Sequence, residues 1–162
     1  MLSVQVSGDT ELIERIGKMP SGVHNALLRK ITALAIEMQR KIRVDKLSGQ
    51  VLNKRTGALQ SSIFQEVSDE RTAIIATVSA GKDVPYAAIH EYGGVTKPHD
   101  IYPKNAKALH FFIGGKEVFA KVVHHPGSKM PERSYMRSTL ADMKQEIIDG
   151  MTDAVRQGAN GK

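Results

Sequence analysis

The feature that most constrains the fold is a long apolar stripe with helical spacing. Between residues 23 and 42 apolar side chains recur at three- and four-residue steps, which is the period of one face of an α-helix of about six turns. Ser21 can cap its first turn. The stripe consists of Val23, Ala26, Leu27, Ile31, Leu34, Ala35, Met38 and Ile42. Other elements must cover this stripe, so the chain is expected to fold around the helix.

A second helix of the same kind is predicted at the end of the chain, beginning near residues 131–136. Its apolar positions are Met136, Leu140, Met143, Ile147, Met151 and Val155. Between the helices, strand patterns from Ile63 and over 72–79 flank a polar turn at 68–71 and predict one hairpin. A second hairpin is predicted over 109–123, where Gly114-Gly115 supplies the turn.

These elements predict the α+β class: two long helices packed on one face of a mainly antiparallel sheet, with long irregular loops. The 162 residues fit a single domain, 1–162. A flexible loop is expected at about 45–55 and a frayed C-terminal tail at about 157–162. A short strand over 2–6 and a short helix over 11–16 are expected before the first long helix. Residues 95–107 are predicted to be loop with at most a short extended piece at Ile101-Tyr102, and residues 124–131 to be irregular.

A short stretch over 85–94 is expected to organise these parts. Pro85 presets the backbone for a helical turn, and Gly93-Gly94 provides a left-handed stop, so one or two helical turns are predicted there. Upstream, Thr56 can cap a single turn in which Leu59 points inward.

Positive charge is concentrated in one part of the chain. The net charge is +6, and residues 21–55 alone hold eight basic side chains against Glu37 and Asp45. One interpretation is a solvated helix face followed by a basic loop. The other is electrostatic docking to an acidic partner or to DNA.

No group of residues reaches the specificity of a catalytic or metal site. The chain has no cysteine and six histidines. His90-Glu91 begins the His-Glu-x-x-His pattern of zinc enzymes, but Gly94 stands where the second histidine belongs. Ser61-Ser62 lacks the context of a nucleophilic serine, and Gly114-Gly115-Lys116 is explained better by a hairpin turn than by a phosphate loop. We therefore predict no enzyme activity, no cofactor and no metal. Long loops and sheet edges without chemistry are typical of an assembly protein.

Three short motifs occur in a recognisable order. They are Thr56-Gly57-Ala58-Leu59-Gln60-Ser61-Ser62, Tyr86-Ala87-Ala88-Ile89-His90-Glu91-Tyr92-Gly93, and Pro131-Glu132-Arg133-Ser134-Tyr135-Met136-Arg137-Ser138-Thr139-Leu140. With them the chain resembles the head-tail joining proteins of long-tailed bacteriophages, also called neck, tail-completion, minor tail or virion-morphogenesis proteins. The family often has Pro-Ala-Arg-Pro-Phe where this chain has Pro131-Glu132-Arg133-Ser134-Tyr135, which leaves the subfamily and the position in the virion open.

The resemblance implies a structural virion component of a phage or prophage tail. It would complete the tail or join it to the head connector as a subunit of a homo-oligomeric ring. The implied partners are a head-completion or connector protein and a tail terminator or tail tube, with possible non-specific DNA contact. The implied location is the tail or neck of the virion, and the host cytoplasm during assembly.

Two groups of residues follow from these interpretations. Partner or assembly contacts are assigned to Arg40, Lys41, Arg43, Lys46, Lys54, Arg55, Tyr86, Tyr92, Arg133 and Tyr135. Structural motif positions are Thr56, Gly57, Leu59, Glu91, Gly93 and Gly94. The motif positions and tyrosines can equally serve only to hold the fold together.

Two other functions are kept open. One is a basic nucleic-acid-binding module, whose affinity would fall steeply with added salt. The other is a histidine-dependent metallohydrolase that uses His90 or His124. No membrane contact is expected, because no run of about 18 apolar residues occurs. The first residues lack a basic region and a long apolar run, so no signal peptide is expected.

Overall fold

The computed structural model describes residues 2–5, 21–70 and 73–160, and for residues 2–5 the backbone alone. Helices and antiparallel strands are both present, which confirms the α+β class. The predicted helix over 11–16 and residues 71–72 of the predicted turn lie outside the described residues.

The largest sheet among the described residues has three strands. It consists of β1 (Leu2–Gln5), β2 (Ile63–Glu70) and β3 (Ala73–Ala80) in the order β1-β3-β2, and both pairings are antiparallel. β3 is therefore the central strand, and β2 forms an edge among the described strands. The predicted hairpin over 63–79 is confirmed, since Ile63 pairs with Ala80 and Glu70 with Ala73.

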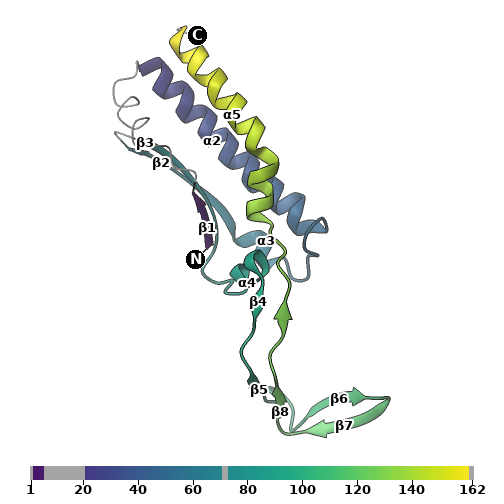
Figure 1. The fold of residues 1–162 in the computed structure, drawn as a ribbon. Coiled ribbons are helices and arrows are strands. Elements are labelled where there is room, and N and C mark those ends of the chain that lie inside the picture. Colours follow the sequence, from purple (N-terminus) through teal and green to yellow (C-terminus); the bar gives the residue numbers. More distant parts are fainter. Residues whose placement is uncertain (1, 6–20, 71–72, 161–162) are drawn as a thin grey trace.

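Two long helices run side by side next to this sheet (Figure 1). α2 (Ser21–Val44) contacts both β2 and β3, and α5 (Met136–Ala159) packs along α2. The apolar stripe of α2 faces inward as predicted, with Ile31 only half-buried. In α5 the prediction for Val155 was wrong, because Val155 is exposed and the buried residues of its last turns are Gly150, Ala154 and Gly158. Small residues there allow the two helix backbones to approach each other.

Apolar side chains from distant segments meet in one main cluster. Ile42 of α2, Ile63 of β2 and Met143 of α5 lie within it and are almost completely buried. The segment 45–55 also takes part, since Leu47 and Leu52 are buried in this cluster and Lys46–Ser48 forms a 3-10 turn, η1. The sequence predicted only a flexible loop here, because the isolated spacing of these two leucines gives no periodic signal of burial.

Two short helices lead into and out of the sheet. α3 (Ala58–Ser62) follows Thr56, whose hydroxyl accepts a hydrogen bond from the Ala58 N–H at 3.3 Å, and Leu59 packs against the main cluster. α4 (Ala87–Tyr92) ends at Gly93. Gly57, Gly93 and Gly94 all have positive φ, as expected of the motif glycines. The predicted turn over 85–94 is confirmed.

Residues 94–130 form a long extension, which we call the arm; the remaining described residues are the body. Its strands are β4 (Gly94–Val95), β5 (His99–Ile101), β6 (Leu109–Ile113), β7 (Lys116–Ala120), β8 (Val123–His125) and β9 (Lys129–Met130). They pair in the ladders β4-β9, β5-β8 and β6-β7. The arm points away from the body, and the β6-β7 hairpin lies at its far end (Figure 1).

The arm corrects two predictions. Residues 95–107 and 124–131 were expected to be irregular, but they pair with each other as the two legs of the arm. These strands have only two or three residues and no buried face, so neither length nor periodicity reveals them. The predicted hairpin over 109–123 is confirmed at its turn, although β7 ends at Ala120 and Val123 belongs to β8.

At the C-terminus, α5 continues to Ala159 and Gly158 is buried, so residues 157–159 are helical.

Candidate assembly surface

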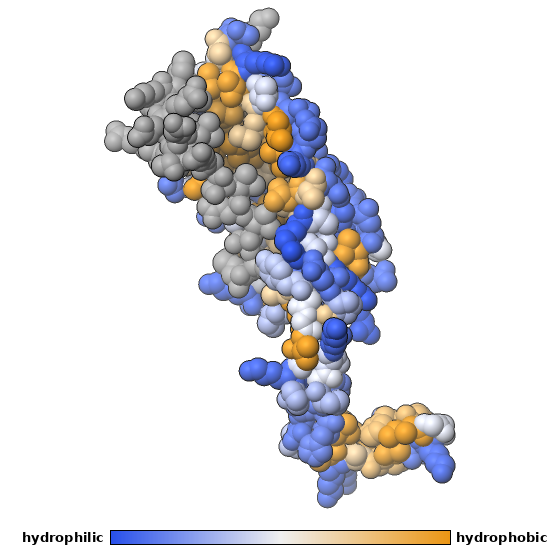
Figure 2. All heavy atoms as spheres, in the orientation of Figure 1, coloured by the Kyte–Doolittle hydropathy of each residue, from blue (hydrophilic) through white to orange (hydrophobic). Residues whose placement is uncertain are grey.

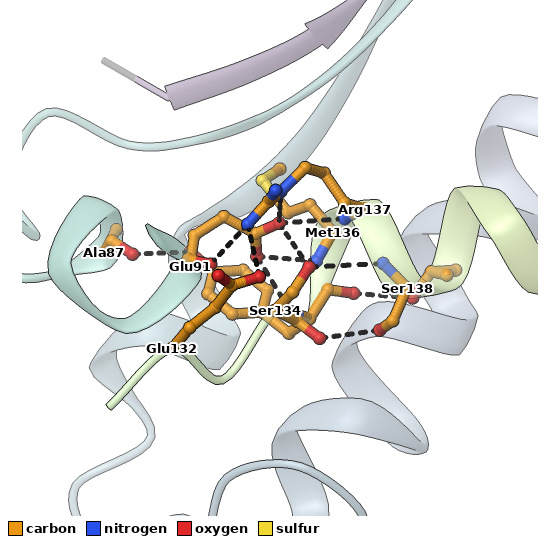
Figure 3. Close-up of polar contacts among 9 residues, drawn as sticks. Ala87, Glu91, Glu132, Ser134, Met136, Arg137 and Ser138 are labelled. Atoms are coloured by element: carbon orange, nitrogen blue, oxygen red, sulfur yellow. Dashed lines mark hydrogen bonds and ion pairs between the residues drawn. The ribbon is translucent and has the colours of Figure 1, made fainter. Parts of the chain in front are cut away.

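The arm leaves the body between the end of α4 and the start of α5, and a buried carboxylate lies at this junction. Glu91 of α4 is 1 % exposed. Its oxygens accept hydrogen bonds from the backbone N–H groups of Tyr135, Met136 and Arg137 at 2.8–2.9 Å (Figure 3). The Ser134 hydroxyl donates a further bond at 2.7 Å. A side chain from one helix therefore caps the N-terminus of another helix 44 residues later in the chain.

The environment of Glu91 favours the carboxylate. Burial by itself would raise the pKa of Glu91. The N–H groups of Met136, Arg137 and Tyr135, together with the Ser134 hydroxyl, outweigh this effect and hold the pKa below its ordinary value. The partial positive charge at the N-terminus of α5 also favours the ionised form of Glu91. The junction thus contains a fixed negative charge.

Arg137 extends this junction to the surface. Its guanidinium lies 3.2 Å from a Glu91 oxygen, donates to the Glu91 carbonyl at 2.9 Å and donates to Glu132 at 2.8 Å. It also lies 4.7 Å from the centre of the exposed Tyr92 ring, within range of a cation–π contact. We call Glu91, Ser134 and Arg137 the clamp, because together they connect the two ends of the arm.

The two legs approach each other closely at two points. At the base, the Arg133 N–H donates to the His90 carbonyl at 2.8 Å, and a Cβ on Gly93 would lie 2.8 Å from the Glu132 nitrogen. Further out, Gly127 lies against the Thr96 carbonyl so closely that a Cβ would overlap it. Both glycines have positive φ. Any larger residue at these positions would force the legs apart.

Histidines lie in the middle of the arm, around a shallow hollow of about 470 Å³. The His99 and His125 rings stack at 5.0 Å, and His124 Nδ1 lies 2.5 Å from an Asp100 oxygen. His90 instead lies in α4 at the base, where burial and the Arg133 charge lower its pKa. Within the described ranges, no three histidine or carboxylate side chains are placed to hold a metal ion. The metallohydrolase hypothesis therefore has no site in this part of the chain.

The arm has no interior of its own. None of the residues 94–130 is buried. At its far end, large apolar side chains face solvent: Phe112 is 66 % exposed, Phe119 65 % and Ile113 63 %. Figure 2 shows this hydrophobic group on the hairpin, separated from the body by a mostly polar stretch. An isolated two-stranded hairpin is marginally stable in water, so such a surface is typical of a contact with another protein.

The predicted contact residues fall into three groups. Tyr135 is fully buried and its hydroxyl donates to the Ala87 carbonyl, while Lys46 is nearly buried and bonds Asp142 at 2.7 Å. A partner cannot reach these two on the folded surface. Arg40 and Lys41 are engaged with Glu37 and Glu146. The remaining residues are exposed: Arg43, Lys54, Arg55, Tyr86, Tyr92 and Arg133.

Sequence reasoning did not select the hairpin tip or Arg137 as candidate site residues. A signal for the tip was present, because Leu109-His110-Phe111-Phe112-Ile113 places apolar residues at consecutive positions and not only at alternating ones. In a strand, consecutive apolar residues indicate two covered faces. Arg137 gave no comparable signal, since Glu91 and Tyr92, two of the residues that it contacts, lie in α4.

No helix in the described part of the chain is both long and apolar enough to cross a membrane. A family model for the phage virion morphogenesis family matches residues 32–156, which include most of α2, the sheet strands β2 and β3, the whole arm and most of α5. Comparisons with curated proteins and with solved structures gave no significant match.

Proposed function

Because the chain belongs to the phage virion morphogenesis family, we propose that it is a ring subunit that completes the phage tail or joins the tail to the head connector. Membership of the family gives it a structural role in building the virion and an association with other virion proteins. The ring, the tail or neck position and the individual partners belong to the proposal. Assembly would take place in the host cytoplasm.

The observation that carries this proposal is the arm. A compact body with an uncovered extension is suited to a subunit whose final contacts form only with neighbours. The clamp sets where both legs of the arm leave the body, so each copy would present its hairpin in the same direction. Repeated weak contacts of this kind add up around a closed ring.

Exposed residues around the base of the arm extend this surface. Tyr86 and Tyr92 are 40 % and 52 % exposed, and Arg133 is also exposed. Tyrosine and arginine are enriched at protein interfaces, because both combine apolar contact area with hydrogen bonding. We assign these three residues to contacts with neighbouring virion proteins.

A phage that lacks the gene for this chain provides the test. Electron microscopy of the lysate should show DNA-filled heads and separate tails, because the junction between them is missing. Supplying the intact chain from a plasmid should restore joined particles. Supplying a chain in which a Gly-Gly linker replaces residues 109–120 should not restore them, even though its body folds. Normal virions without the gene would contradict the proposal.

DNA contact is the second candidate, and Arg43, Lys54 and Arg55 favour it. They are exposed, and no ion pair among the described residues involves them. Alanine at all three positions should weaken binding of a short duplex at low salt and reduce the slope of affinity against salt. The matched control is alanine at Lys97, Lys104 and Lys107 of the arm, which removes the same charge elsewhere. Equal duplex binding by wild type and both variants would exclude a dedicated basic site.

A further inference from the structure

The β6-β7 hairpin carries large apolar side chains on both of its faces. Pairing of Phe111 with Val118 and of Phe112 with Glu117 assigns alternate residues to opposite faces. One face holds Leu109, Phe111, Ile113, Val118 and Ala120 with Lys116 at the turn, and the other holds Phe112 and Phe119 beside His110 and Glu117. A hairpin that remains in water has at least one polar face. This hairpin therefore has the composition of strands that are covered by protein on both sides.

The arm also has a strong excess of positive charge. It contains Lys97, Lys104, Lys107, Lys116, Lys121 and Lys129 against Asp100 and Glu117. None of these lysines forms an ion pair with another described residue. A surface that receives the hairpin should therefore combine an apolar side chain with uncompensated carboxylates.

β2 offers such a surface on the same chain. It lies at the edge of the three-stranded sheet, and among the described strands only β3 pairs with it. Its outward side chains, Phe64, Glu66, Ser68 and Glu70, are all exposed. β2 holds three carboxylates and no basic residue; Asp69 lies 3.0 Å from His24, and those of Glu66 and Glu70 have no basic partner among the described residues. An edge strand also offers free backbone groups to an added strand.

A chain cannot make this contact with itself in the observed conformation. The hairpin lies at the far end of the arm, well away from the sheet (Figure 1). We propose that the hairpin of one copy docks on the β2 edge of a second copy. Phe112 and Phe119 then lie against Phe64, and Lys121, two residues after Phe119, supplies positive charge near Glu66 and Glu70, while Glu117 of that face is paired with His110. This inference names the contact between neighbouring subunits of the proposed ring, and it rests on that proposed function.

The geometry of the contact determines how assembly proceeds. The hairpin and the β2 edge are different surfaces, so every bound copy still offers one free hairpin and one free edge. Such a head-to-tail contact continues from copy to copy until the rotation between neighbours closes a ring. Two variants with complementary defects can therefore distinguish it from a symmetric dimer.

The test uses sedimentation velocity of the purified full chain over a concentration series. One variant, Phe112→Ser with Phe119→Ser, lacks the docking hairpin. The other, Glu66→Lys with Glu70→Lys, lacks the receiving edge. We expect the wild type to form a closed oligomer. Each variant alone should associate with an affinity at least about 30-fold lower. An equimolar mixture of the two variants should form 1:1 dimers and nothing larger, because only one working contact remains.

A matched control changes the same charges on another surface. Asp149→Lys with Asp153→Lys on exposed positions of α5 should assemble like the wild type. The inference is overturned if the wild type stays monomeric, if either defective variant assembles normally, or if the mixture stays monomeric. Normal rings from the defective variants would overturn only this contact and leave the ring itself standing. The gene-deletion phenotype tests the role in the virion independently of both results.

Discussion

The body and the arm both contain many apolar residues, but only the body buries them. Tyr135, Met136 and Met143 in the body are 0 % exposed, whereas no residue of the arm is buried. Burial of apolar surface is the dominant favourable term in folding. The body therefore has a source of stability within the chain. The arm depends on backbone ladders, on two close glycine contacts and, in the proposed ring, on the neighbouring copy that covers its hairpin.

The clamp is where these two regions meet. Glu91 lies in the segment that leads into the arm, and its hydrogen-bond donors lie in the segment that follows the arm. The start of α5 is capped only when both ends of the arm are brought together. This arrangement lets an extension of 37 residues interrupt the body without separating α4 from α5.

The largest expected effect comes from removing the clamp. Glu91→Ala leaves three backbone N–H groups and the Ser134 hydroxyl without their acceptor. Because buried donors without partners are costly, we expect the free energy of unfolding to fall by about 3–5 kcal/mol. Urea denaturation followed by circular dichroism measures this loss.

The control is Glu132→Ala, which removes only the exposed partner of Arg137. Exposed ion pairs contribute little, so this variant should stay within about 1 kcal/mol of the wild type. Similar losses in both variants would show that the buried carboxylate has no special role at the junction.

A direct comparison of the two regions uses one apolar truncation in each. Met143→Ala creates a cavity in the main cluster and should lower the free energy of unfolding by about 2–5 kcal/mol. Phe112→Ala removes a larger side chain, but one that faces solvent, so the monomer should change by no more than about 0.5 kcal/mol. Both values come from denaturant titration at a concentration where the chain is monomeric. A large loss from Phe112→Ala would mean that the hairpin packs on its own body.

The body was predictable from sequence because its buried side chains recur with the period of a helix or a strand. The α2 stripe, the 63–80 hairpin and the turn before Gly93 were all found from spacing, capping and glycine. Val155 was misassigned, since the period of α5 continues past the point where glycine and alanine replace large side chains at the interface. Leu47 and Leu52 were missed because they lie in a loop without a period.

The arm was largely unpredictable because it buries no residues and so, outside its hairpin, has no regular pattern of apolar side chains. Its legs pair over two or three residues each, between segments about 30 residues apart, and no side-chain pattern marks the partner. The hairpin was found because its strands are longer and flank a Gly-Gly turn. The importance of Glu91 could be stated only as a motif position, because its donors lie 43 to 46 residues away.

A smaller effect tests how closely the two helices of the body approach. A Cβ on Gly158 would lie 2.7 Å from the Gly22 oxygen and from the Val23 nitrogen, both of which are backbone atoms. Gly158→Ala must therefore separate the helices, and we expect a loss of about 1–3 kcal/mol. Gly150→Ala is the matched control, because its nearest neighbours are the end atoms of the flexible Lys30 side chain. Because alanine has a higher helix propensity than glycine, Gly150→Ala should raise the free energy of unfolding by up to about 1 kcal/mol. Equal shifts of the unfolding temperature in Gly158→Ala and Gly150→Ala would contradict the close contact at Gly158.

The smallest effect is the pH dependence of the clamp. The pKa of Glu91 is lower in the folded chain than the ordinary value of 4.5. Its contribution to stability is therefore complete above pH 4.5 and is lost as the pH falls through the folded pKa, by about 1.4 kcal/mol for each unit of lowering. Glu91→Gln cannot ionise, so its unfolding free energy should fall less steeply than that of the wild type below pH 4.5. Glu132→Gln, which neutralises an exposed carboxylate, should keep the wild-type slope. If all three slopes agree, the acid sensitivity of the chain arises from carboxylates outside the junction, and the arm is joined to the body by shape and backbone contacts more than by this charge.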